Sequence, residues 1–199
     1  MENDLEKIFD FLKQIEKLKS TLRYNKTTGG RNESTADHSW RLALMVPVIA
    51  EELKVDIDIE KSMKIALVHD LAEAITGDID AIKIATGEVS KEEKKKQELA
   101  AMDKIRGMLP EKTGEDIYNL WQEYEKASTK EGKFVKGLDK SETLTQLVEA
   151  GYTTYDKPDF IADYTEEAIK NFPELKNLLL IVRDKLKMEF VKGGFVWKD

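Results

Sequence analysis

The sequence predicts an all-α fold, and three observations support this expectation. Apolar residues recur at steps of three and four along almost the whole chain, which is the period of helices that bury one face. Residues that cap helices precede several of these segments, and prolines stand near the ends of others. No segment combines sustained alternation with hairpin turns, as strands do. We therefore expect one helical domain that spans residues 1–199.

The N-terminal half of the chain is expected to form three helices and one polar loop. The helices are expected over residues 3–21, 34–53 and 58–74, and the loop over residues 24–33. Ser34 and Asp37 have the spacing of a capping box, which marks the start of the second helix. Asp58 is placed to cap the third helix. Pro47 lies inside the second helix and should kink it, because its ring removes one backbone hydrogen bond.

The C-terminal half is expected to be helical throughout. The helices are expected over residues 90–109, 114–128, 131–151, 160–171 and 173–191. Ser90 opens a long charged helix, and Pro110 should stop it because the residue before a proline avoids the helical conformation. Pro173 suits the first turn of the last helix, where an N–H group has no helical partner. The run Lys94–Lys96 stands among glutamates, and we interpret it as a solvated helix face.

The composition limits the classes of function. Hydrophobic residues make up 41% of the 199 residues and charged residues 36%, as in an ordinary globular protein with a solvated surface. The net charge of -7 argues against binding to a nucleic-acid polymer, which needs clustered lysine and arginine. We find no apolar stretch of membrane-spanning length and no signal-peptide pattern. The absence of cysteine excludes thiolate metal ligands and fits a reducing compartment, so we expect a cytoplasmic protein.

The two histidines of the chain, His38 and His69, are the most informative residues. His69 directly precedes Asp70, and Asp139 stands beside the apolar stripe of a later helix, where a carboxylate needs a partner. Imidazole and carboxylate together suit one divalent ion of Zn, Mn, Co, Fe or Ni. Glu73 follows His69 by four residues, so the two should share a helix face. This combination favours a metal-dependent hydrolase.

The same residues resemble a known family. A histidine, a His-Asp pair and a later aspartate form the four-ligand signature of the HD-domain metal-dependent phosphohydrolases. The segments Glu33–Ser39 and His69–Ile79 are similar to those of the 5′-deoxynucleotidase branch, and the contexts Leu138–Lys140 and Asn171–Leu175 also fit. The resemblance covers about residues 5–185, which it identifies as the core of one HD-domain helical bundle.

The resemblance implies a role for each residue of the signature. His38, His69, Asp70 and Asp139 match the metal ligands. Glu73 matches the acidic residue that orients the attacking water. Asp78 matches a residue that contacts the sugar or assists the leaving group.

The resemblance also implies substrate-binding residues and a homodimer. Arg23 corresponds to an arginine that holds phosphate, and Tyr24 to an aromatic residue that shapes the sugar pocket. That aromatic residue is usually tryptophan in the bacterial enzymes, so the tyrosine bears on selectivity for 2′-deoxyribose. Arg31, in the expected loop, is a further family-like position. The three tryptophans, Trp40, Trp121 and Trp197, are expected to fill core or interface positions.

The expected activity is removal of the 5′-phosphate from (deoxy)nucleoside 5′-monophosphates by water that a metal activates. Two alternatives remain open. The chain could hydrolyse another phosphate ester, such as a cyclic nucleotide, a dNTP or a sugar phosphate. It could also be an HD module that binds metal or nucleotide without turnover, although Glu73 and Asp78 favour catalysis.

Overall fold

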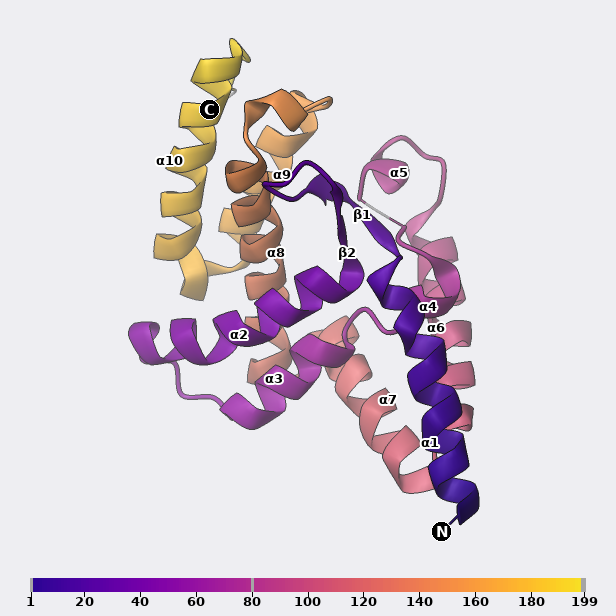
Figure 1. Ribbon diagram of the computed structural model, residues 1–199. Helices are drawn as coiled ribbons and strands as arrows, with labels where there is room; N and C mark the ends of the chain where they lie inside the picture. The colour runs from indigo at the N-terminus through magenta and orange to yellow at the C-terminus, as the bar shows by residue number, and fades with distance from the viewer. Residues whose placement is uncertain (1, 80, 198–199) are drawn as a thin grey trace.

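The computed structural model describes residues 2–79 and 81–197, which are mostly helical (Figure 1). In chain order the elements are α1 (Glu2–Ile15), η1 (Glu16–Lys19), β1 (Leu22–Lys26), β2 (Asn32–Ser34), α2 (Thr35–Leu53), α3 (Ile59–Val68), α4 (Glu73–Thr76), α5 (Ala81–Ala85), α6 (Lys91–Met108), α7 (Glu111–Lys126), α8 (Lys130–Ala150), η2 (Tyr152–Thr154), α9 (Pro158–Asn171), η3 (Pro173–Leu175) and α10 (Lys176–Gly193). The predicted all-α class is confirmed. None of the described helices combines the length and apolar character that a membrane span requires.

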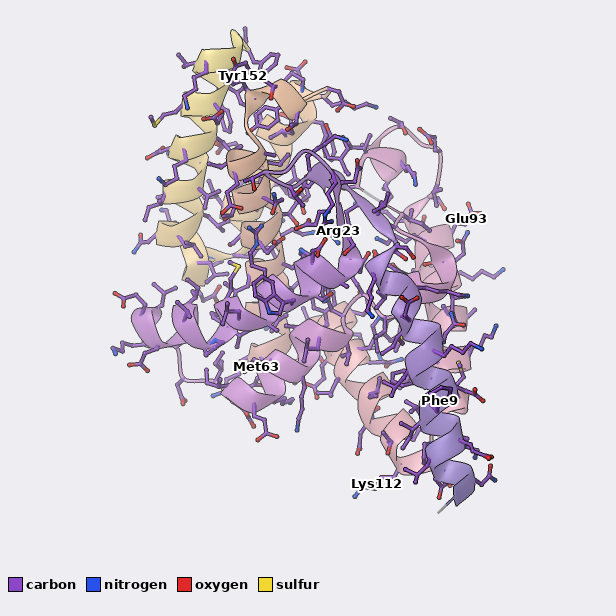
Figure 2. All side chains as sticks on the ribbon, viewed as in Figure 1. Phe9, Arg23, Met63, Glu93, Lys112 and Tyr152 are labelled. Atoms are coloured by element: carbon purple, nitrogen blue, oxygen red, sulfur yellow. The ribbon has the colours of Figure 1, made fainter. Side chains whose placement is uncertain are left out.

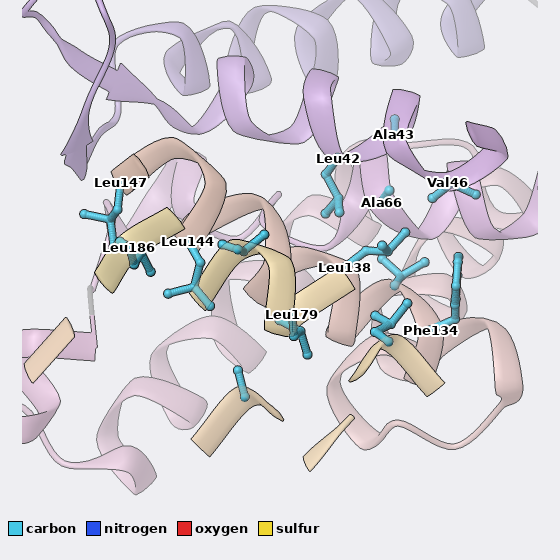
Figure 3. Packing of buried hydrophobic residues seen from close by; sticks show 14 of the residues in the cluster. Leu42, Ala43, Val46, Ala66, Phe134, Leu138, Leu144, Leu147, Leu179 and Leu186 are labelled. Atoms are coloured by element: carbon cyan, nitrogen blue, oxygen red, sulfur yellow. The ribbon is translucent and has the colours of Figure 1, made fainter. Parts of the chain in front are cut away.

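Two apolar clusters hold the helices together. The larger cluster joins α2, α3, α8, α9 and α10, and Figure 3 shows its leucines converging from α2, α8 and α10. Leu42, Leu138 and Leu186 are completely buried there, and burying a leucine side chain contributes about 1.5–3 kcal/mol. The smaller cluster joins α1, α6 and α7 through residues such as Met102 and Trp121. The functional residues lie where these two clusters meet.

The end of α3 connects the clusters and differs from the expectation. The predicted helix over residues 58–74 was wrong, because α3 ends at Val68 and a tight turn over residues 69–72 follows. In this turn the N–H of Leu71 donates to the carbonyl of Val68 (3.1 Å), a bond to the third residue back instead of the fourth. Ile65 and Ala66 therefore stay in the larger cluster while Val68 and Leu71 enter the smaller one.

The segment expected to be a polar loop forms a β-hairpin instead. Strands β1 and β2 pair antiparallel, and Gly30 supplies the positive φ of 85° that their connection needs. The hairpin depends on α8: Asn25 Nδ2 donates to the carbonyl of Thr143 (3.0 Å), and Gln146 Nε2 donates to the carbonyl of Lys26 (2.6 Å). Polar contacts hold these strands, and their residues do not alternate between apolar and polar. The sequence pattern therefore did not predict them as strands.

The predicted helix starts are confirmed by their caps. The Ser34 hydroxyl accepts from the N–H of Asp37 (3.1 Å), and the Asp37 carboxylate accepts from the N–H of Ser34 (2.9 Å). Asp58 and Ser90 each accept from the N–H three residues later, at 2.9 and 3.0 Å. Helix α2 continues through Pro47. Helices α1 and α10 differ from the expected ranges at one end each. The last residues expected in α1 form the 3₁₀ helix η1, and the first residues expected in α10 form the 3₁₀ helix η3.

Gly132 allows α8 to begin directly against the end of α7. A Cβ atom at this position would lie 2.4 Å from the carbonyl oxygen of Glu123, a backbone atom that cannot rotate away. Gly107, in α6, has no atom within 4 Å of the equivalent position. The two glycines therefore form a matched pair for testing how closely the helices pack.

Gly132→Ala is expected to lower the free energy of unfolding by about 1–3 kcal/mol, the usual cost of an overpacked contact. Gly107→Ala should instead raise it by about 0.5–1 kcal/mol, because alanine loses less backbone entropy in a helix. Urea denaturation followed by circular dichroism measures both values. Equal effects of the two substitutions would contradict the close α7–α8 contact.

Candidate metal centre

Three buried side chains from three separate elements converge at the junction of the clusters. His38 comes from the second turn of α2, His69 from the turn after α3, and Asp139 from the middle of α8. One nitrogen or oxygen atom from each lies within 4.8 Å of those of the other two. The imidazole rings of His38 and His69 are 5.3 Å apart between centroids. The structure therefore brings together three of the four expected metal ligands.

The Nε2 atom of His69 faces His38 and Asp139. Its Nδ1 lies 2.8 Å from the carbonyl oxygen of Ala66, and because a carbonyl can only accept, Nδ1 carries the proton. Its other ring nitrogen, Nε2, is buried, has no hydrogen-bond partner among the described residues and lies 3.0 Å from Asp70 Oδ2. A metal ion bound between Nε2 and the neighbouring carboxylates would satisfy this nitrogen.

His38 is oriented in a similar way by a carboxylate. Its Nδ1 contacts Glu142, whose other oxygen accepts from Arg41 Nε (2.6 Å). Arg41 Nη1 continues the chain of charges to Glu149 at the surface (2.5 Å). His38 Nε2 faces Asp139 Oδ1 at 3.2 Å without a hydrogen-bond geometry.

The charges around His38 favour a cation. Burial and the nearby Arg23 oppose a charge on the imidazole, but Glu142 and Asp139 outweigh them and raise the pKa of His38 to about 10. This position therefore attracts positive charge, whether a proton or a metal ion.

Asp139 keeps one oxygen available. Its Oδ2 accepts from the Tyr124 hydroxyl (2.7 Å) and lies 3.5 Å from Lys140 Nζ. Oδ1 remains directed at His38. Burial would raise the pKa of Asp139, but Lys140 and His38 hold it well below its usual range, so the side chain is an anion.

Asp70 joins the group from the side of the adjoining cleft. Its Oδ2 lies 3.0 Å from His69 Nε2 and 3.0 Å from Arg23 Nη1. Burial opposes its charge, but His69 and Arg23 lower its pKa below the usual range. The four residues together offer two imidazole nitrogens and two carboxylates, a set that fits a divalent transition ion.

Glu73 is a second buried acid beside the candidate metal centre. It is the first residue of α4, is only 4% exposed and accepts a hydrogen bond from Thr35 Oγ1 (2.7 Å). Burial, with Asp70 and Asp78 nearby, raises the pKa of Glu73 well above its usual range. The expectation that it shares a helix with His69 was wrong, since the turn separates them.

A cleft of about 800 Å³ opens onto these residues. Its lining residues include the predicted residues His69, Asp70, Glu73, Asp139, Arg23, Tyr24 and Asp78. Arg23 lies near the centre of the molecule (Figure 2), where its Nε is also 3.6 Å from Glu33. The Tyr24 hydroxyl donates to Asp156. Most of the sequence-predicted residues thus face one space. His38 lies buried behind His69 and Asp139 and does not line the cleft, and Arg31 is exposed and paired with Asp37 (2.7 Å) outside it.

Several residues of the site were not expected. Lys94 was interpreted as solvated, and this was wrong: it lines the cleft, and its Nζ donates to the carbonyl of Ile79 (2.9 Å). Tyr124, Lys140 and Glu142 support the candidate ligands but were not predicted. The sequence offered one signal for Glu142. It follows Asp139 by three residues, and residues three apart lie on the same side of a helix, so it could have been expected near the candidate ligands.

The sequence matches the HD-domain family over residues 15–176. The chain belongs to the HD-domain family. The predicted membership is thus confirmed, and its signature residues are those that the fold gathers at the candidate metal centre.

Known HD-domain proteins resemble the chain over most of its length. The 5′-deoxynucleotidase HDDC2 of Xenopus laevis is 34% identical over 89% of this chain and 87% of its own. The 5′-deoxynucleotidase hdd1 of Schizosaccharomyces pombe is 39% identical over 71% of each chain. The crystal structure of a predicted metal-dependent phosphohydrolase from Magnetospirillum magnetotacticum superposes with a TM-score of 0.76, at 26% identity, covering 98% of this chain and 99% of the other.

Loss of the His69 imidazole should abolish metal binding. The wild-type protein is expected to retain about one divalent transition ion per chain after loading and gel filtration, and His69→Ala to retain none, because its neighbours cannot replace the ligand. Arg31→Ala, which changes an exposed residue outside the cleft, should bind metal like the wild type. Elemental analysis measures all three, and a wild-type protein without metal would overturn the site.

Proposed function

We propose that this HD-domain protein is a metal-dependent phosphohydrolase that removes the 5′-phosphate from (deoxy)nucleoside 5′-monophosphates. The observation that carries the proposal is the convergence of the buried His38, His69 and Asp139, with ligand atoms within 4.8 Å of one another, beside a cleft that Arg23 and Glu73 also line. The relatives named 5′-deoxynucleotidases, which match along most of their length, support the same chemistry.

The proposed ligands of the ion are His38, His69, Asp70 and Asp139. When bound, a divalent ion lowers the pKa of water and polarises a phosphoryl oxygen. Nitrogen and oxygen donors without thiolate suit Mn, Co, Zn, Fe or Ni.

Arg23 is proposed to hold the phosphate. Its guanidinium is kept in place by Asp70 (3.0 Å) and by Glu33, so it needs little reordering when a substrate enters. A guanidinium can bind two phosphate oxygens at once, which also offsets the negative charge of the cleft.

Glu73 is proposed to take the proton of the attacking water. Its Oε2 is occupied by Thr35, which leaves Oε1 for the water. A carboxyl whose pKa is raised binds a proton more readily than an ordinary glutamate, as a general base requires. Asp78, at the side of the cleft, is proposed to contact the sugar or assist the leaving alkoxide.

Tyr24 is proposed to shape the sugar pocket. Its hydroxyl is held by Asp156, so the ring has a fixed place beside the cleft. We expect deoxyribonucleotides to be preferred, less sharply than in relatives with tryptophan at this position. A different phosphate ester remains the second candidate, while a binding module without turnover is disfavoured by the buried acid Glu73.

We also propose a cytoplasmic homodimer. The absence of cysteine fits a reducing compartment. Trp40, Leu44 and Val48 stand four residues apart on α2 and are 65%, 53% and 59% exposed, so they form an apolar stripe along one helix face. Aromatic residues are enriched at such interfaces.

Glu73→Gln should retain metal but lower kcat for dAMP by about 10²–10⁴-fold, the usual effect of losing a general base. Glu93→Gln is the control, since Glu93 lies on α6 and points away from the molecule (Figure 2). Release of inorganic phosphate and elemental analysis are measured on the same samples. Loss of metal in Glu73→Gln would make this residue a ligand instead of a base.

Phosphate release should be faster from dAMP than from AMP, and absent from dATP, because one arginine and one ion compensate a single phosphoryl group. Arg23→Ala is expected to raise KM and lower kcat together, since the phosphate is held in both ground and transition states. Tyr24→Trp should increase the ratio of kcat/KM for dAMP over AMP. A preference for AMP or for the triphosphate would favour the second candidate function.

Trp40→Glu should convert a dimer into a monomer, because the new charge would lie in the apolar interface. Phe9→Glu is the matched control, since Phe9 is 68% exposed on α1. Analytical ultracentrifugation distinguishes the two states. A monomeric wild type, or dissociation only in Phe9→Glu, would contradict the proposed interface.

A further inference from the structure

Asp78 lies in a segment that cannot fix its own conformation. Residues 77–79 follow α4, which has four residues, and precede α5, which has five. Gly77 opens the segment with a positive φ of 72°. Helices this short have too few internal hydrogen bonds to hold a connection rigidly, so the place of Asp78 depends on contacts from elsewhere.

Two lysines supply such contacts to the backbone of the segment. Lys83 Nζ donates to the carbonyl of Asp78 (3.1 Å), and Lys94 Nζ donates to the carbonyl of Ile79 (2.9 Å). Lys83 belongs to α5, the short helix next to the segment. Lys94 belongs to α6, which is capped by Ser90 and anchored by the buried Met102 in the smaller cluster. The second contact therefore ties the segment to a long, anchored helix.

Lys94 is itself held in a defined position. Its Nζ lies 3.5 Å from Glu98, one turn further along α6, and the side chains are 28% and 14% exposed. Both residues line the cleft. Burial disfavours the ammonium, but Glu98 and the acids of the cleft raise the pKa of Lys94, so it stays charged. A charged, partly buried lysine that donates to a backbone carbonyl differs from the mobile lysines of a solvated face.

We propose that Lys94, held by Glu98, is a positioning residue that fixes the Asp78 segment against α6 at the side of the cleft. The inference rests on the proposed function, because it assumes that Asp78 acts on the substrate. Lys94 would then affect the reaction through Asp78 and not through a contact of its own with the phosphate.

The test uses the metal-loaded full-length protein and two independent measurements. The first is amide hydrogen exchange of residues 77–79, which reports how often that segment opens. Lys94→Met should increase the exchange there, Lys94→Arg should restore most of the protection, and Lys96→Met, on an exposed neighbouring residue of α6, should leave it unchanged.

The second measurement is a double-mutant cycle with dAMP. Lys94→Met should lower kcat/KM by up to about 10²-fold, the loss that a displacement of about 1 Å can cause. In a protein that already carries Asp78→Asn, Lys94→Met should lower kcat/KM little further, because both substitutions remove the same contribution of Asp78 to the reaction.

The outcomes separate the two proposals. Unchanged exchange in Lys94→Met overturns the positioning role. Multiplicative losses in the double mutant also overturn it and indicate direct contact between Lys94 and the substrate. Increased exchange in a protein that hydrolyses no nucleotide supports the positioning of the segment and overturns the proposed function instead.

Discussion

The hydrogen bond from the Nδ1–H of His69 to the carbonyl of Ala66 determines the rest of the site. It forms because α3 ends at Val68, so that the next residue begins a tight turn. The bond places a proton on Nδ1 of His69 and directs Nε2 toward His38 and Asp139. The same turn carries Asp70 to the cleft and starts α4 with Glu73, so one change of backbone geometry places three functional side chains.

Electrostatic balance is the second requirement of the site. The cleft contains the acids Asp70, Glu73, Asp78 and Asp139, yet its proposed substrate is an anion. Arg23 and Lys140 stand against two of these carboxylates, at 3.0 and 3.5 Å. These ion pairs lie in a partly buried environment, where screening by water and salt is weaker than at the surface.

The sequence predicted the parts of the structure that depend on local chemistry. Ser34, Asp58 and Ser90 cap helices as expected because capping needs only residues three positions apart. The convergence of His38, His69 and Asp139 could be inferred because few residue types bind such ions.

Tertiary contacts explain what the sequence did not predict. The hairpin is held by α8 through Asn25 and Gln146, and its polar residues have no strand pattern. The end of α3 follows from the division between two clusters, which local periodicity does not contain. Lys94 was misread because the carbonyl that it binds lies 15 residues away.

A series of ion pairs connects His38, one of the proposed metal ligands, with the surface of the protein. Glu142 and Arg41 link the buried imidazole to Glu149, whose side chain is 43% exposed. The carboxylate that faces this buried nitrogen is therefore paired with an arginine that also contacts an exposed glutamate. A substitution at this surface glutamate would therefore act first on Arg41 and Glu142, and would leave every proposed ligand in the sequence.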